Sequence, residues 1–123
     1  MPIKTYHDLD VFREAYDAAL AVSKLTRTFP AVEQFELARQ LRRAARSVPA
    51  NIAEGWAKRN STAEFKSYLQ VAMGSCHEVK FWLDMSRDEG YVSVAEIDEL
   101  KGRYDRIGAM LYGLWKNWRR IDR

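Results

Sequence analysis

Residues 39–55 read RQLRRAARSVPANIAEG and divide one predicted helix into two opposite faces. Arginines at positions 39, 42, 43 and 46 follow the spacing of neighbours on one helical face. At about 100° per residue, the other three fall within roughly 60° of Arg39. The apolar residues in and beside this stretch fall on the opposite half: Leu37, Leu41, Ala44, Ala45, Val48 and Ile52. This pattern predicts a helix with a guanidinium row in solvent and an apolar row against a core.

The second half of the same stretch is irregular for a helix. Pro49 has no N–H to donate to the preceding turn and its ring crowds that turn, so we expect a kink there. Asn51 and Glu54 fall on the flank between the arginine face and the apolar face. Two roles are open for them: capping carbonyls freed near Pro49, or pairing with Ser75 or Glu78 across a helix interface. We favour a structural polar network.

Apolar residues recur at helical spacing along the rest of the chain. They predict helices over about 9–27, 32–58, 62–89 and 94–120, joined by short breaks. No strand-like alternation, internal repeat or linker is present in the sequence. Helices of similar length with short connections predict an all-α fold: an antiparallel up-down four-helix bundle in a single domain, 1–123.

Local signals fix the predicted helix ends. Pro30 disfavours a helical conformation at the residue before it, which ends the first helix. Ser61 with Glu64, and Ser93 with Glu96, have the spacing of capping boxes at the starts of the third and fourth helices. Gly90 suits the left-handed position that ends the third helix.

Charge is distributed unevenly along the 123 residues, whose net charge is +3. Residues 39–59 carry six basic side chains against Glu54, and residues 116–123 carry four against Asp122. Local basic surfaces on an otherwise acidic body predict contact with an anion at a defined place. Cys76 is the single cysteine, so no intrachain disulfide forms. The sequence shows neither an export signal nor an 18-residue apolar run, so we expect a cytoplasmic protein without a membrane partner.

Residues for catalysis or metal binding are sparse. The two histidines, His7 and His77, lack the paired spacing of a zinc or di-iron helix site, so we expect no metal and no cofactor. Ser75 and His77 are two residues apart and point to different sides of a helix. Cys76 falls on an apolar row, where an inert buried thiol is the usual state. We therefore expect no catalytic residues; Gly74, in mid-helix, is expected to allow close helix contact.

The arginine row has three interpretations. It is an ordinary solvated helix face, a phosphate-binding surface, or one half of ion pairs with a neighbouring subunit. Arginine's planar fork suits phosphates and carboxylates, and Glu33, Glu36 and Glu78 are acids available for such pairs. The first helix has a second apolar row, and Trp56, Trp82 and Trp115 are not clearly placed on core rows. This apolar excess indicates either self-association or a thick core around bulky rings.

Several motifs together resemble a known family. They are Phe29-Pro30 with Glu33, residues 40–44 (QLRRA), residues 47–55 (SVPANIAEG), Arg59, and residues 72–75 (AMGS) with Glu78. The chain is similar, from about residue 9 to 118, to the four-helix-bundle proteins encoded in 23S rRNA intervening sequences. The resemblance implies a structural role for the motif residues Pro49, Asn51, Glu54, Gly55, Gly74, Ser75 and Glu78. It also implies a homopentameric ring without known catalytic activity. The accessory variability determinant of diversity-generating retroelements shares this architecture and binds nucleic acid.

We therefore expect a non-enzymatic cytoplasmic oligomer that binds nucleic acid, structured RNA before DNA. Arg39, Arg42, Arg43 and Arg46 would contact phosphates, and Lys58 and Arg59 would extend the surface. The alternative is a structural or protein-interaction oligomer in which the same arginines form ion pairs with neighbouring subunits or with a partner protein.

Overall fold

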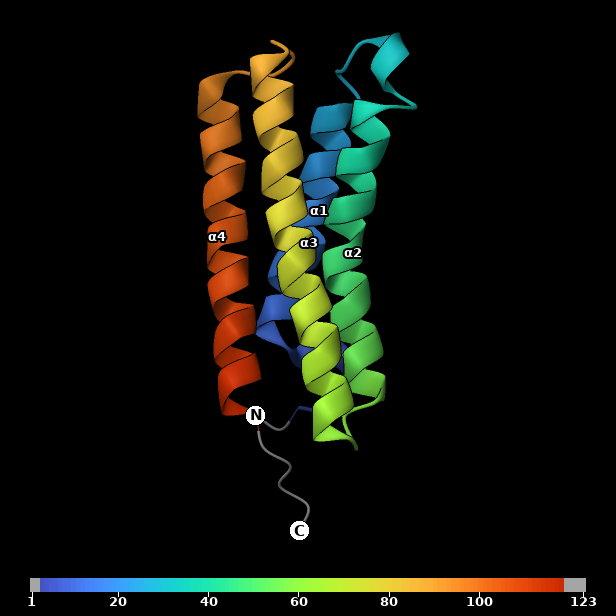
Figure 1. The fold of residues 1–123 in the computed structure, drawn as a ribbon, viewed down its shortest axis with the longest axis vertical. Helices are drawn as coiled ribbons and strands as arrows, with labels where there is room; N and C mark the ends of the chain where they lie inside the picture. The colour runs from blue at the N-terminus through green and yellow to red at the C-terminus, as the bar shows by residue number, and fades with distance from the viewer. Residues whose placement is uncertain (1–2, 119–123) are drawn as a thin grey trace.

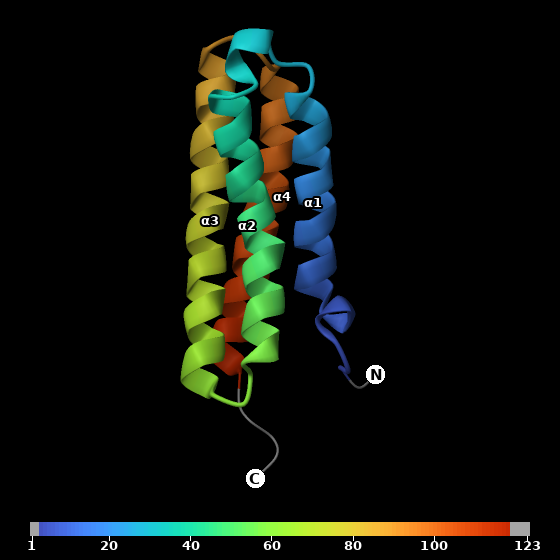
Figure 2. The same ribbon diagram turned by 90° about the vertical axis from the view of Figure 1, so that its right-hand side faces the viewer.

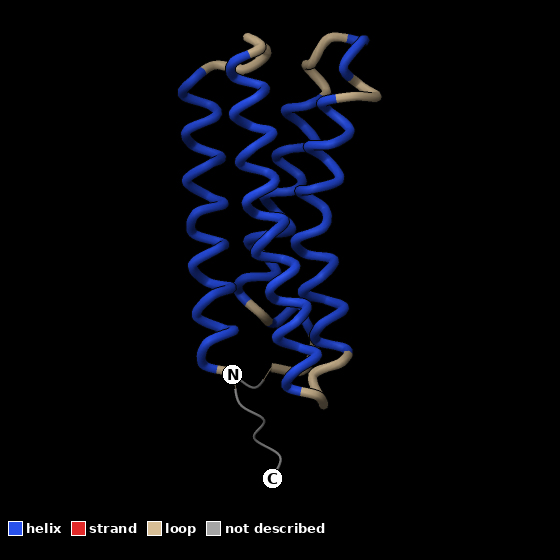
Figure 3. Tube along the Cα trace, viewed as in Figure 1, coloured by secondary structure: helices blue, strands red, loops and turns tan. Residues whose placement is uncertain are grey.

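The computed structural model describes residues 3–118, which form an antiparallel bundle of four α-helices (Figure 1). The helices are α1 (Asp10–Thr26), α2 (Leu37–Ala57), α3 (Thr62–Asp88) and α4 (Val94–Asn117). Two short 3-10 helices, η1 (Tyr6–Asp8) and η2 (Ala31–Glu33), precede α1 and α2. No strand occurs among these residues (Figure 3). The predicted all-α four-helix fold is confirmed.

The core forms where the apolar rows of the four helices meet. Leu41 and Ile52 of α2, Leu69 of α3 and Tyr104 of α4 are fully buried. Each buried large apolar side chain stabilises the fold by about 1.5–3 kcal/mol. In α1 the row that includes Val22 is buried, whereas Tyr16 of the other row is half exposed. One apolar row of α1 is therefore only partly covered within the chain.

The serine half of each predicted capping box is present at the starts of α3 and α4. The Ser61 hydroxyl accepts a hydrogen bond from the Glu64 N–H, and Ser93 accepts one from Glu96, both at 3.2 Å. At α4 the glutamate carboxylate accepts from the serine hydroxyl at 3.0 Å instead of reaching back to the serine N–H. Gly90 has φ +82°, a value that strains residues with a side chain, so it permits the sharp turn after α3.

The predicted start of the second helix at residue 32 is wrong. Residues 31–33 form η2, and α2 begins at Leu37 after Glu36, whose φ of −116° and ψ of −101° are not helical. The Gln34 side-chain amide donates to the carbonyls of Thr26 and Phe29 at 2.9 and 3.0 Å. These contacts turn the chain back towards α1, which local helix spacing in the sequence does not reveal.

The other helix bounds lie close to those predicted. α2 continues through Pro49, which is buried, to Ala57; the kink at Pro49 remains a prediction. α4 ends at Asn117 and Trp118 is extended. The predicted end of this helix, residues 119–120, lies outside the described residues. Trp118 packs edge-on against Phe65 and Trp56, with ring centroids 4.5 and 6.0 Å apart.

Candidate functional site

Three arginines of the predicted row lie on the outer crest of α2. Arg39, Arg43 and Arg46 are exposed, and we call them the arginine crest. Figure 2 shows α2 facing the viewer, with α1 on one side and α3 on the other. Among residues 3–118, no hydrogen bond, ion pair or ring contact occupies any of the three guanidinium groups. The crest is therefore an open cationic surface about 10 Å long at 1.5 Å per residue.

Arg42 differs from the crest because its guanidinium group is used inside the chain. It is half-buried. Nη1 donates to the Thr26 hydroxyl at 3.0 Å and to the Gln34 side-chain oxygen at 3.3 Å, and Nη2 donates to the Gln34 carbonyl at 2.9 Å. Arg42 therefore fastens the α1–α2 connection to α2, and its side chain is not available to an external phosphate in this arrangement.

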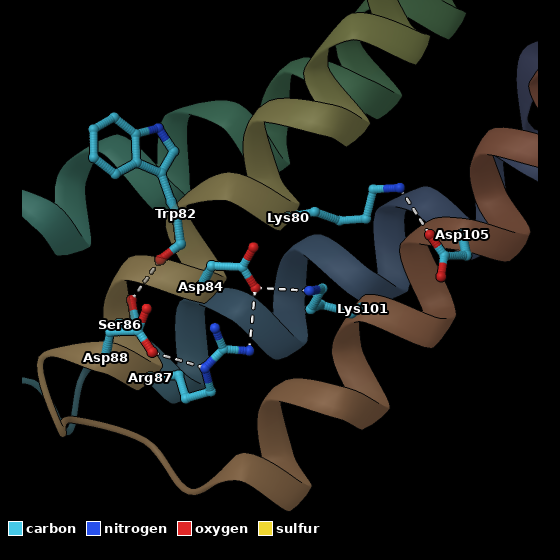
Figure 4. A network of polar contacts seen from close by, with 8 residues as sticks. All are labelled: Lys80, Trp82, Asp84, Ser86, Arg87, Asp88, Lys101 and Asp105. Atoms are coloured by element: carbon cyan, nitrogen blue, oxygen red, sulfur yellow. Dashed lines mark hydrogen bonds and ion pairs between the residues drawn. The ribbon is translucent and has the colours of Figure 1, made fainter.

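Acidic side chains of α3 and α4 have cationic partners along the α3–α4 interface, from near the turn towards the middle of both helices (Figure 4). Asp84 contacts Lys101 at 2.7 Å and Arg87 at 3.4 Å, and Lys80 contacts Asp105 at 2.7 Å. Lys80 holds the pKa of Asp105 below its usual range, and Arg87 does the same for the pKa of the adjacent Asp88. These charges are balanced locally, in contrast to the arginine crest.

Lys58 and Arg59 lie at the far end of α2 from the start of the crest. Lys58 is 12 residues beyond Arg46, about 18 Å along the helix. Its ammonium is 5.4 Å from the centre of the Tyr68 ring, and the Tyr68 hydroxyl raises the pKa of Lys58, so its charge is retained. Arg59 stacks over Trp56 at 4.3 Å and donates to the Trp56 carbonyl at 2.9 Å. These two cations form a separate basic surface at the α2–α3 turn.

The polar motif residues meet at the seam between α2 and α3. The hydroxyls of Ser47 and Ser75 are 2.8 Å apart, and the Asn51 amide donates to the Ser47 carbonyl at 2.8 Å and to its hydroxyl at 3.0 Å. Glu78 accepts from the Trp82 indole at 3.1 Å. Asn51 therefore contacts Ser47 of its own helix, and it is Ser47 that contacts Ser75 across the interface; among residues 3–118 neither Asn51 nor Glu54 pairs with Ser75 or Glu78.

The remaining motif residues have different surroundings. Glu54 is exposed, and its carboxylate oxygen Oε2 forms a long ion pair with Lys58 Nζ at 3.9 Å. Gly55 is buried in close contact with α3, since a Cβ there would lie 2.8 Å from the Cβ of Tyr68. Gly74 is exposed, and a Cβ there would meet nothing within 4 Å. The close helix contact expected at Gly74 therefore occurs at Gly55 within this chain.

The residues considered for catalysis do not form a reactive group. His77 is exposed, Ser75 is held by Ser47, and Cys76 is buried. Burial raises the pKa of the Cys76 thiol to about 12. In the described part of the chain no three His, Cys, Asp or Glu side chains gather as a metal site. Nor is any described helix long and apolar enough to cross a membrane.

We expect the Cys76 thiol to react slowly with a disulfide reagent such as DTNB while the protein is folded. Its raised pKa keeps it protonated at pH 8, and only the thiolate is the nucleophile. Unfolding in urea returns the pKa of the thiol to its ordinary range, so the reagent should then release one thionitrobenzoate anion per protein chain. The measurement is absorbance against time with and without urea; rapid labelling of the folded protein would contradict this prediction.

An apolar groove runs between α1 and α2, below the crest arginines. It has a volume of about 400 Å³ and is lined by Tyr6, Phe12, Tyr16, Ala19, Leu20, Ser23, Arg46, Pro49, Ala50 and Ala53. The side chains of Tyr16 and Leu20 are 51% and 57% exposed, so the apolar lining of the groove is open to solvent. Part of the second apolar row predicted for the first helix lines this groove, but the position of the groove between α1 and α2 depends on tertiary packing.

Comparisons with known proteins agree with the bundle. A crystal structure described as a protein of unknown function from the S23 ribosomal protein family of Bacteroides thetaiotaomicron VPI-5482 has a TM-score of 0.80. It is 21% identical and the match covers 87% of this chain and 96% of that chain, so it shows the shared fold. The comparison with curated proteins gave no match. Residues 7–113 match the family described as 23S rRNA-intervening sequence protein. The chain belongs to this family, the 23S rRNA-intervening sequence proteins.

Proposed function

We propose that this protein is a non-enzymatic cytoplasmic homo-oligomer that binds nucleic acid, with structured RNA as the favoured ligand. The observation that carries the proposal is the arginine crest, three exposed guanidinium groups without partners among residues 3–118. A guanidinium fork makes paired hydrogen bonds to phosphate oxygens, which a lysine does not. Arg42 is left out of the proposed surface because Thr26 and Gln34 occupy it.

The expected binding is strong in low salt and weakly dependent on sequence. Phosphate contacts position a nucleic acid without reading its bases, and each contact releases counterions, so affinity falls steeply as salt rises. Three arginines per chain form a modest surface. A homo-oligomer, a pentamer as the family resemblance implies, would present several copies and raise avidity without new contacts. Lys58 and Arg59 offer a second basic surface on the same chain.

The test is fluorescence anisotropy of a labelled RNA hairpin and a DNA duplex across a salt series. The triple variant Arg39→Ala, Arg43→Ala and Arg46→Ala should bind roughly 10- to 100-fold more weakly and lower the salt slope by about 2 to 3. A charge-matched control replaces Lys24, Arg103 and Lys116 with alanine; the first two line the α1–α4 side of the bundle. Equal losses in both variants, or no binding by the parent protein in low salt, would refute the proposal.

The alternative is that the crest arginines pair with carboxylates of a neighbouring subunit. The open apolar groove beside Arg46 favours some contact between copies on this side. Sizing chromatography with light scattering on the variant Arg39→Ala, Arg43→Ala separates the two functions. An unchanged mass supports phosphate binding by the crest, whereas collapse to monomer supports ion pairing between subunits.

A further inference from the structure

A cavity of about 290 Å³ lies in the seam between α3 and α4, the two antiparallel helices that Figure 1 shows side by side. His77 and Lys80 line it from α3, and Asp105 and Tyr112 line it from α4. Pockets that hold drug-sized ligands have volumes of roughly 300–1,000 Å³. The α3–α4 cavity is at the lower end of this range, so it suits one flat ring system better than an extended cofactor.

Tyr104 brings an unpaired hydrogen-bond donor to this cavity. Its side chain lines the cavity and is fully buried, and its hydroxyl has no hydrogen-bond partner among residues 3–118. Burial raises the pKa of this hydroxyl, and the thiol of Cys76, another lining residue, raises it further, so the proton stays on the oxygen. A buried donor without an acceptor is unfavourable. A ligand that presents an acceptor would satisfy it.

The charges that line the cavity balance each other. Lys80 Nζ contacts Asp105 Oδ1 at 2.7 Å. No hydrogen bond among the described residues uses the other carboxylate oxygen of Asp105 or the ring nitrogens of His77. A carboxylate oxygen accepts hydrogen bonds, and a neutral imidazole both donates and accepts them. Balanced charge with free donors and acceptors favours a neutral polar ligand over an ion.

One wall of the cavity is aromatic. Tyr112 lines the cavity and is 52% exposed, and its ring stacks on that of Trp115 with the centroids 5.9 Å apart and the planes at 25°. The ammonium group of Lys66, on α3, is 5.2 Å from the centre of the Trp115 ring. A flat ligand in the cavity can therefore stack on Tyr112, and Lys66 supplies a cation beside the stack for an attached phosphate.

Gly108 keeps the cavity open on the α4 side. It lines the cavity, and a Cβ at this position would meet nothing within 4 Å. A larger side chain at position 108 would therefore extend into free space and fill the cavity without displacing its walls.

We infer that the α3–α4 cavity binds a nucleobase, with its ring stacked on Tyr112 and an acceptor on its edge bonded to the Tyr104 hydroxyl. A nucleobase is flat and carries both donors and acceptors on its edges, which is the combination that the cavity lining offers. The base belongs to an unpaired nucleotide of an RNA strand or to a free nucleoside. The inference goes beyond the proposed function, because the arginine crest is on α2 and contacts phosphates, whereas this cavity contacts a base.

Titration with the fluorescent nucleoside 2-aminopurine riboside tests the cavity directly. Its emission falls when the base stacks on an aromatic ring, so binding should quench it. Gly108→Leu fills the cavity and should weaken binding at least about 10-fold. Gly102→Leu is the matched control, because Gly102 is on the same helix with free space for a Cβ but is exposed outside the cavity. No quenching by the parent protein, or equal binding by the two leucine variants, would overturn the inference.

Tyrosine substitutions test the two assigned contacts. Tyr104→Phe removes only the unpaired hydroxyl, so without ligand the variant should unfold at the same or a higher urea concentration. It should nevertheless bind the nucleoside roughly 3- to 10-fold more weakly. Tyr112→Ala removes the stacking surface and should weaken binding at least about 5-fold. Tyr16→Ala is its control, because Tyr16 is 51% exposed on α1. Unchanged affinity in Tyr104→Phe and Tyr112→Ala would overturn the inference, as would a less stable Tyr104→Phe that binds like the parent.

RNA hairpins distinguish the two sources of the base. If the ligand is an unpaired nucleotide, 2-aminopurine placed in the loop should be quenched when the hairpin binds, and the same probe in the paired stem should not. Quenching of the free nucleoside without quenching in the loop identifies a nucleoside site. Quenching of neither probe overturns the inference.

The same titrations separate this inference from the proposed function. The triple variant Arg39→Ala, Arg43→Ala and Arg46→Ala keeps the cavity, so it should bind the nucleoside as tightly as the parent protein does. Nucleoside binding without any binding of the hairpin refutes the proposed function alone. Hairpin binding through the crest without quenching of either probe refutes the cavity assignment alone.

Discussion

Gly55→Leu is expected to destabilise the fold by about 3 kcal/mol, and Gly55→Ala by about 1–2 kcal/mol. A Cβ at position 55 would lie 2.8 Å from the Cβ of Tyr68 and 3.2 Å from the ring of Phe65. The Tyr68 Cβ is attached to the α3 backbone, so it cannot swing away, and the two helices must separate. Both substitutions gain up to about 1 kcal/mol in helix propensity over glycine; alanine has the smaller net effect because it adds only the Cβ, whereas leucine must also fit three more carbons into the same contact. The measurement is urea unfolding followed by far-UV circular dichroism.

Gly102→Ala is the matched control for Gly55. Gly102 is also inside a helix, α4, but is exposed, and an added Cβ would meet nothing within 4 Å. It should stabilise the protein by roughly 0.5–1 kcal/mol, because alanine restricts the unfolded chain more than glycine does. Equal destabilisation by both substitutions would show that the contact with Tyr68 is not the cause.

Arg42→Ala should cost about 2–3 kcal/mol of unfolding free energy, more than any substitution in the arginine crest. The guanidinium group donates three hydrogen bonds to Thr26 and Gln34. Its removal leaves half-buried acceptors without a donor, and hydrogen bonds to charged groups contribute about 1.5–3 kcal/mol. Arg42→Lys keeps the charge but lacks the planar fork, so it should recover only part of the loss.

Hydrogen exchange locates the effect of Arg42. Faster exchange in Arg42→Ala should appear first in residues 27–36, because the side chain fastens this connection to α2. Arg39→Ala is the control. Because Arg39 is exposed and unpartnered among residues 3–118, this substitution should change the unfolding free energy of the protein by less than about 0.5 kcal/mol. A loss in Arg39→Ala equal to that in Arg42→Ala would contradict the assignment.

The arginine row shows where sequence spacing succeeds and where it fails. Helical periodicity correctly placed four arginines on one side of α2, because angle around a helix depends only on residue number. It did not distinguish Arg42 from Arg39, since that difference depends on Gln34 and Thr26, which reach Arg42 only after the α1–α2 connection folds back. For the same reason the start of α2 was predicted five residues too early.

The two motif glycines show the same limit for packing. Both Gly55 and Gly74 were identified within motifs, but their surroundings depend on how α2 and α3 lie against each other. Gly55 is packed against Tyr68 and Phe65 of α3, and Gly74 is exposed. Lys58 and Arg59, adjacent to the arginine row in the predicted surface, lie at the other end of α2 on aromatic rings.

The sequence by itself determined that there are four helices, the capping serines of α3 and α4, the Gly90 turn and the apolar face of α2, because these depend on local hydrogen bonding and a fixed periodicity. Tertiary structure alone decided which arginine is internal, which glycine permits close packing, and where the open groove lies. Each of those features depends on contacts between side chains of different chain segments. The distances between these side chains follow from how the helices lie against one another, which the periodicity within one helix does not encode.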